Sequence, residues 1–154
     1  MAVAWADMST GDFMVKEIPE AGLETLIAQL DPSELVMPNN FTCPDWLDSA
    51  AVSLSEQAPA LFDSTSGRQM LESFYQVGSL DGFGDFSRAM LSAAGALLGY
   101  FETTQIGNMP PLSRLQTIVD AAHMEIDPAT RRSLELTRTL AGESRGSLLH
   151  AIDR

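Results

Sequence analysis

The side chains that could bind a nucleotide or a metal are few and poorly spaced in this 154-residue chain. A phosphate-binding loop of the G-x-x-x-x-G-K-[ST] type needs a lysine directly after a glycine. The only lysine, Lys16, lies between Val15 and Glu17, which excludes such a loop. His123 and His150 are 27 positions apart and belong to no metal-binding motif, so structural or surface roles are favoured for both. We therefore expect no cofactor and no metal in this chain.

Two possible nucleophiles lack neighbours that would activate them. Residues 142–146 (GESRG) match the G-x-S-x-G pattern of a nucleophile elbow around Ser144, and His150 follows. A nucleophile elbow joins a strand to a helix, whereas this pentapeptide follows a helical pattern and leaves no room for the usual acid. We interpret it as a loop. Cys43 is the only cysteine, which excludes an internal disulfide, and its sequence neighbours include no activating base, so we expect an inert thiol.

Four aspartates suggest a different chemistry. Asp7, Asp12, Asp63 and Asp81 could form part of a two-metal nuclease site on a ribonuclease-H-like sheet. Two-metal catalysis needs several carboxylates that converge from adjacent elements, whereas Asp12, Asp63 and Asp81 occupy positions typical of turns and helix caps. A small metal-dependent nuclease that uses Asp7 remains the alternative hypothesis, and we assign no catalytic, cofactor-binding or metal-binding residue.

Charge is distributed unevenly along the chain, whose net charge is −12. Residues 1–112 contain 15 acidic and three basic residues, whereas residues 113–154 contain six of each. The acidic segment would repel a phosphate backbone, so we expect it to make no direct nucleic-acid contact. Basic residues of the second segment could bind phosphates, although interleaved acids favour a solvated face of mixed charge. These residues are Arg114, Arg131, Arg132, Arg138, Arg145 and Arg154.

The overall composition is that of a soluble globular domain, with 45% hydrophobic and 19% charged residues. No apolar run approaches the roughly 18 residues that a membrane span requires. The amino end has no basic region, and its apolar stretch ends at Asp7, too early for a signal peptide. These features predict a cytoplasmic protein.

The spacing of apolar residues predicts an α/β fold. Residues 2–7 and 13–17 show a β-hairpin pattern around a turn at 9–12. Residues 19–30 carry an apolar stripe typical of a helix, and residues 34–37 are strand-like. A helix between strands indicates a crossover unit in a mixed sheet.

The pattern weakens over residues 39–59, to which we assign little structure. Asp63 can cap a helix that Gly78 would end, and a long helix is predicted over residues 85–105, where Ser92, Gly95 and Gly99 leave room for a close neighbour. Beyond a linker, further elements are predicted from the same signals. These are strands at 115–119 and 123–126, a helix from Asp127 to Gly142, and the beginning of a helix at 147.

Several stretches, in this order, together resemble the MutS family of DNA mismatch-repair proteins. Residues 3–13 (VAWADMSTGDF) resemble the hairpin of its connector domain, and residues 30–35 (LDPSEL) its helix-to-strand step. Residues 79–84 (SLDGFG) and 93–105 are similar to a turn and the long connector helix. The most specific match is residues 126–137 (IDPATRRSLELT), which are similar to the beginning of the core domain.

The resemblance implies a connector domain over residues 1–112, without its first strand, and a truncated beginning of the all-α core domain over residues 113–154. The connector would have a ribonuclease-H-like α/β fold with a mixed sheet and flanking helices, but no nuclease chemistry. Its implied role is interaction and allosteric relay within a homodimeric mismatch-repair ATPase of the DNA damage response. The parent protein would bind mismatched DNA, ATP and magnesium through other domains, and a MutL-type partner.

Residues that carry out the family's known chemistry lie outside this chain. The mismatch reader of the family is an F-x-E motif ahead of the connector, and none of the seven phenylalanines here is followed two positions later by glutamate. The ATP-binding loop of the family lies far beyond the beginning of the core. No functional residue of the family can be transferred, and we expect no enzymatic activity from this chain alone.

Overall fold

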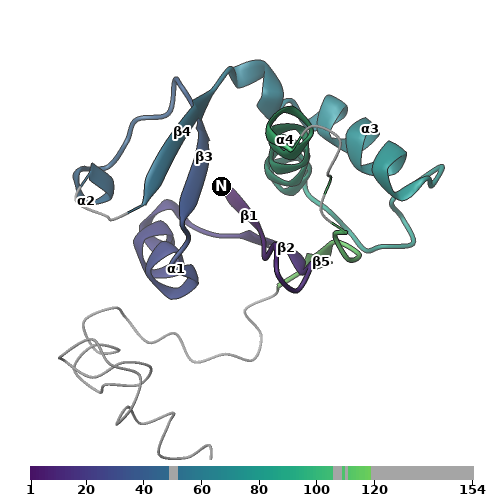
Figure 1. Ribbon diagram of the computed structural model, residues 1–154, viewed down its shortest axis with the longest axis horizontal. Coiled ribbons are helices and arrows are strands. Elements are labelled where there is room, and N and C mark those ends of the chain that lie inside the picture. The colour runs from purple at the N-terminus through teal and green to yellow at the C-terminus, as the bar shows by residue number, and fades with distance from the viewer. Residues whose placement is uncertain (49–51, 106–108, 110, 119–154) are drawn as a thin grey trace, which may run out of the picture.

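The computed structural model describes residues 1–48, 52–105, 109 and 111–118 (Figure 1). Strand β1 (Ala2–Ala6) and strand β2 (Phe13–Glu17) form the predicted antiparallel hairpin, in the register Ala2 opposite Glu17 to Ala6 opposite Phe13. Gly11 shapes its turn with a φ of +79°, and a Cβ there would lie 2.5 Å from the Pro111 carbonyl oxygen. Glycine therefore serves both the turn and a close approach of the later chain.

The strands of the described residues form two small sheets. β5 (Gln116–Thr117) pairs in parallel with β2, which makes the sheet β1-β2-β5 mixed, as predicted. β3 (Glu34–Pro38) follows helix α1 (Leu23–Leu30), but it pairs in parallel with β4 (Ser53–Gln57) rather than with the hairpin. The strand after the first helix thus belongs to a second sheet, which corrects the predicted crossover onto the hairpin.

The expectation of little structure over residues 39–59 is also wrong. This segment contains the short helix α2 (Asp45–Asp48), strand β4 and the start of the 3-10 helix η2 (Pro59–Phe62). β4 has the sequence SLSEQ, whose only large apolar side chain, Leu54, is 36% exposed. β4 is a strand because it pairs with β3. Its sequence lacks the alternation of apolar and polar residues that predicts a strand, so the indication from sequence was weak.

Helix boundaries follow local capping chemistry. The short 3-10 helix η1 (Glu20–Gly22) leads into α1, which ends at Asp31, a residue with a positive φ, just before Pro32. Helix α3 (Ser64–Tyr75) begins as predicted at Asp63, whose side chain accepts hydrogen bonds from the main-chain N–H groups of its first turn. It ends at Gln76, which takes the left-handed conformation in place of the predicted Gly78.

The longest helix among the described residues, α4 (Arg88–Thr104), begins after Ser87 and therefore three residues later than predicted. The Ser87 hydroxyl accepts a hydrogen bond from the Met90 N–H at 3.2 Å. The sequence predicted that α4 has a close neighbour, and in the structure this neighbour is α3. A Cβ on Gly95 would lie 2.2 Å from the Gly67 Cα atom, so the two helix backbones are in direct contact.

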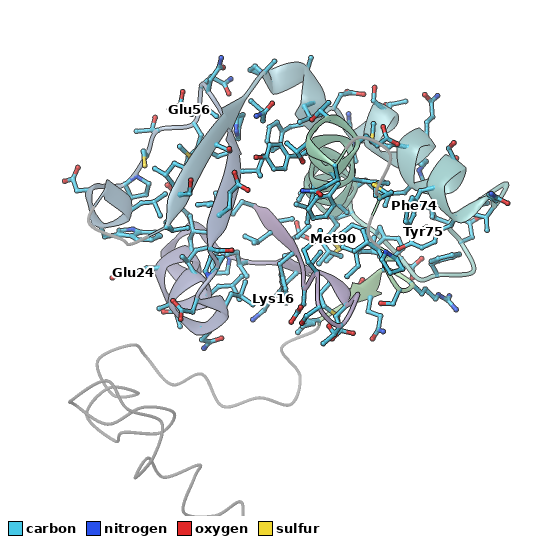
Figure 2. The ribbon with its side chains drawn as sticks, in the orientation of Figure 1. Lys16, Glu24, Glu56, Phe74, Tyr75 and Met90 are labelled. Carbon is cyan, nitrogen blue, oxygen red and sulfur yellow. The ribbon has the colours of Figure 1, made fainter. Side chains whose placement is uncertain are left out.

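The hairpin lies between two apolar clusters. On one face, α3 and α4 cover the buried side chains of β2, including Phe13 and Val15. On the other face, α1 packs against Val3 and Trp5 of β1. Figure 1 shows α1 on one side of the hairpin and the α3–α4 pair on the other, and Figure 2 places charged side chains such as those of Glu24 and Glu56 on the outside.

The last described residues return to this core. Leu112 and Leu115 are buried, and the Tyr75 hydroxyl donates a hydrogen bond of 2.7 Å to the Ser113 carbonyl oxygen. Figure 2 shows Tyr75 near the end of α3, and burial raises its pKa to about 12. The predicted strand at 123–126 and the helices that follow lie outside the described residues.

Candidate functional site

An apolar cavity of about 530 Å³ lies between the two sheets. β1 lines one side of the cavity along its whole length, and β3 lines the opposite side. Helices α1 and α4 close the two remaining walls with apolar side chains. These include Leu23, Ile27 and Leu30 of α1 and Ala93, Ala96 and Leu97 of α4. A cavity of this size and lining falls within the range of binding pockets.

A cluster of three polar side chains lies at one edge of this cavity. The Tyr100 hydroxyl donates a hydrogen bond of 2.6 Å to the Glu34 carboxylate, and the Ser55 hydroxyl donates another of 2.8 Å to the same oxygen. The two hydroxyl oxygens are 3.1 Å apart. The hydrogen bond to Glu34 is the main cause of a raised Tyr100 pKa. This cluster connects α4 to both strands of the second sheet, and we assign it a structural role.

The aspartates of the nuclease hypothesis are engaged in turns and caps. One carboxylate oxygen of Asp7 accepts hydrogen bonds from the Ser9 N–H at 2.7 Å, the Ser9 hydroxyl at 2.5 Å and the Thr10 N–H at 3.3 Å. These bonds, foremost that of the Ser9 side chain, lower the pKa of Asp7. Asp12 accepts a hydrogen bond of 2.8 Å from the Thr10 hydroxyl in the same turn. Asp7 therefore stabilises the hairpin turn as a carboxylate.

The other two aspartates lie in different parts of the fold. Asp63 caps α3, and its hydrogen bond from the Ser66 N–H is the main cause of its lowered pKa. The Asp81 N–H donates to the Ser79 hydroxyl in the turn ahead of α4. No group of three or more His, Cys, Asp or Glu side chains in the described ranges is arranged to hold a metal ion. The structure gives the nuclease hypothesis no support.

The remaining candidate residues have varied positions. Lys16 lies on β2, and Cys43 is half-buried in the segment between β3 and α2. Of the later arginines, Arg114 lies over the Phe83 ring, 4.4 Å from its centroid, and hydrogen-bonds the Gly82 carbonyl oxygen. The two histidines, the GESRG segment and the five other arginines lie outside the described residues. None of the described helices is both long and apolar enough to cross a membrane.

Comparison with known proteins decides the family. Residues 1–113 match the model of MutS domain II. The chain belongs to the MutS family. The DNA mismatch repair protein MutS of Ruegeria pomeroyi is 46% identical over 156 residues, which cover 99% of this chain and 18% of the relative. MutS of Cereibacter sphaeroides is 43% identical over 153 residues, 99% of this chain and 17% of the relative. The resemblance seen in the sequence is confirmed, and the chain spans less than a fifth of these MutS proteins.

Sequence reasoning did not find the cavity between the sheets. Its lining comes from β1, α1, β3 and α4, which are separated by up to about a hundred positions. The periodicity of apolar residues within one segment cannot indicate that such distant segments come together. The alternation of Ala2, Ala4 and Ala6 reports packing and not the cavity, because these side chains lie on one face of β1 and pack against the buried cluster that includes Val15 and Leu98.

Proposed function

We propose that this chain is the connector and relay module of a MutS-type mismatch-repair protein. The observation that carries the proposal is the match of residues 1–113 to MutS domain II, together with 46% identity to a mismatch repair protein over 99% of the chain. The proposed role is to transmit a conformational signal between neighbouring domains and to bind a partner. It needs no catalytic residue within these elements.

The parent protein that we propose is a homodimeric ATPase. Its other domains bind mismatched DNA and hold ATP with magnesium, and it acts in the cytoplasm. Two features of this chain support the assignment of DNA and ATP binding to other domains. Residues 1–112 carry 15 acidic and three basic residues, which disfavours contact with a phosphate backbone. The one lysine lies on β2, where no phosphate-binding loop can form.

We propose the same domain division as the sequence indicated. Residues 1–112 form the connector, a ribonuclease-H-like domain, and residues 113–154 belong to the all-α core domain. Residues 113–118 lie on the connector side of this division in space, because β5 pairs with β2 and Leu115 is 1% exposed. A connection of this kind would couple a displacement of the core to the hairpin.

The proposed partner is a MutL-type protein, and a direct binding assay tests it. The chain is immobilised and incubated with purified MutL of Ruegeria pomeroyi in the absence of DNA. We expect saturable binding, since recruitment by the connector requires only protein surfaces. An unrelated protein of similar negative charge serves as the control. Absence of binding, or equal binding to the control, would overturn the adaptor role.

A further inference from the structure

Strand β4 presents one edge of its main chain away from β3. Ser53 donates its N–H to the residue just before β3 at 3.1 Å, and Gln57 accepts a hydrogen bond from the residue just after β3 at 2.9 Å. Odd-numbered residues of β4 therefore direct their main-chain groups toward β3. In a strand the alternate residues direct theirs the other way. The N–H and carbonyl groups of Leu54 and Glu56 accordingly point away from the sheet.

This edge has the form of a strand that can be extended. Within the described ranges, β4 pairs with no strand other than β3. Figure 1 shows β4 on the outer side of the second sheet, with β3 between it and the hairpin. Many edge strands are interrupted by a proline or a bulge, which hinders further pairing. β4 contains no proline and keeps a continuous register with β3, so its main chain is suited to pair with one more strand.

The two faces of this edge differ in their side chains. Leu54 and Glu56 share one face, and both are exposed. Figure 2 shows Glu56 on the outside of the molecule. The other face carries Ser53, Ser55 and Gln57, and the Ser55 hydroxyl is already hydrogen-bonded within the structure. A strand added beside β4 would thus meet one apolar and one acidic side chain on one face, and uncharged polar side chains on the other.

The part of the chain that contains β4 is strongly acidic. Residues 17–67 include the whole second sheet with helices α1 and α2, and they contain nine acidic residues and no lysine, arginine or histidine. The basic residues in the described ranges lie on β2, on α3, at the start of α4 and just ahead of β5. They are Lys16, Arg68, Arg88 and Arg114. A negative potential of this kind attracts a cationic partner and repels an anionic one.

We infer that β4 is a docking edge for an extended basic segment of another protein, which adds a strand to the second sheet. The main-chain groups of Leu54 and Glu56 hold the segment, as in other cases of strand addition. An apolar side chain of the segment covers Leu54, and a lysine or arginine two positions away pairs with Glu56. A second copy of this chain fits poorly, because it would bring another acidic surface to the same edge. The inference does not rest on the proposed relay function.

A titration of the full chain with a designed peptide tests the inference. The probe is a fluorescently labelled peptide of about eight residues, with threonine at every second position and leucine and lysine alternating at the others. We expect saturable binding by fluorescence anisotropy and slowed hydrogen exchange at the amides of Leu54 and Glu56. A peptide with glutamate in place of lysine should bind at least about tenfold more weakly, because repulsion replaces attraction.

N-methylated peptides test whether the main chain carries the contact. Only every second amide of an added strand faces β4, and the others face solvent. N-methylation of the set that faces β4 should weaken binding by at least about tenfold, because several hydrogen bonds are lost. N-methylation of the other set should have a much smaller effect. Equal effects of the two modifications would contradict strand addition.

A pair of charge-reversal variants locates the site. Glu56→Lys should weaken binding of the lysine peptide by at least about fivefold and strengthen binding of the glutamate peptide. Asp81 is exposed in the turn ahead of α4, next to the contact between Arg114 and Gly82 and so beside the first sheet. Asp81→Lys changes the net charge equally but away from β4, so it should alter affinity by less than about twofold.

A proline variant tests the edge from the side of the chain. Leu54→Pro removes an N–H that points away from β3, so it should prevent strand addition and leave the β3–β4 ladder in place. A circular dichroism spectrum like that of the parent chain shows that each variant is folded. The charge-reversal pair and the N-methylated peptides still decide the question if Leu54→Pro does not fold.

Four outcomes would overturn the inference. One is no saturable binding, and another is equal weakening by Asp81→Lys and Glu56→Lys, which would mean a general attraction to an acidic protein. The third is binding without exchange protection at Leu54 and Glu56, which would place the peptide elsewhere. The fourth is protection that rises with chain concentration without peptide, since a second copy would then occupy the edge. MutL binding without peptide binding would remove the docking edge alone, and the reverse result would remove the adaptor role alone.

Discussion

Gly67 and Gly95 mark the point of closest approach between α3 and α4. A Cβ on Gly67 would lie 2.4 Å from the Leu91 carbonyl oxygen, and one on Gly95 would lie 2.2 Å from the Gly67 Cα atom. Both obstructing atoms belong to backbone and cannot rotate away. The usual gain in helix propensity from glycine to alanine is therefore opposed by a steric cost.

The first prediction concerns this contact. Gly95→Ala should lower the free energy of unfolding by about 1–3 kcal/mol, the usual cost of overpacking, because the helices must separate. Urea denaturation measures the change. Gly78→Ala is the control, since a Cβ there meets nothing within 4 Å. Equal stability of the Gly95→Ala variant and the parent chain would show that the helix contact is looser than described.

A second prediction concerns Tyr75, whose pKa is raised to about 12 by burial. Because the folded-state pKa lies above the unfolded value, stability should be intact below about pH 10 and fall as the pH rises toward 12. Tyr75 and Tyr100 are the only tyrosines, so ultraviolet titration of Tyr100→Phe reports Tyr75 alone. Tyr75→Phe should weaken the alkaline loss of stability. A Tyr75 titration near its ordinary pKa would contradict the burial.

Individual elements were predictable from sequence to the extent that their signals were local. The hairpin, α1 and α4 were found because their apolar residues repeat with the strand or helix period. β4 was missed because SLSEQ owes its conformation to pairing with β3. The end of α3 was misplaced because Gln76 adopts a positive φ where glycine is the usual choice. The cavity depends on pairs of elements far apart in sequence, and nothing local encodes it.

The third prediction concerns the start of α3. Asp63 accepts hydrogen bonds from the Thr65 N–H at 3.1 Å and the Ser66 N–H at 2.8 Å. Asp63→Ala should lower the melting temperature and speed hydrogen exchange in the first turn of α3, whereas Asp63→Asn should preserve most of the cap. Because its folded pKa is lowered, the stabilisation should be lost as the pH falls below about 4. Unchanged exchange in Asp63→Ala would remove the capping role.

The described part of the chain behaves as one packed unit that extends to residue 118. Leu115 belongs to the same buried cluster as Phe13 and Leu98, and β5 continues the first sheet. The match to MutS domain II ends at residue 113, just before this contact. Residues 113–118, which follow the proposed domain boundary, therefore contribute to the hydrophobic core of the connector.

A fourth prediction concerns the contribution of residues 113–118 to stability. A chain ending at residue 118 should be more stable than one ending at residue 112 by at least about 2 kcal/mol, because the shorter chain loses the buried Leu115 side chain and the β5 ladder. Urea unfolding of the two chains measures the difference. In the longer chain, Leu115→Ala should account for much of it. Equal stability would show that residues 113–118 do not pack on the connector.

A fifth prediction concerns catalysis by the whole chain. Incubation of single- or double-stranded DNA or RNA with the chain and Mg²⁺ or Mn²⁺ should give no cleavage. Asp7 and Asp12 are held in the hairpin turn, whereas Asp63 caps α3 and Asp81 lies in another turn. Gel electrophoresis of the nucleic acid checks this. Metal-dependent cleavage that disappears in Asp7→Asn would restore the nuclease hypothesis.

The backbone contact between α3 and α4 also has a consequence for how this sequence can vary over time. A side chain at either Gly67 or Gly95 forces the same separation of the helices, so whichever substitution comes first bears most of the steric cost. The second then costs less, and the two effects do not add. Homologous chains should accordingly keep both glycines or replace both, and rarely hold one alone.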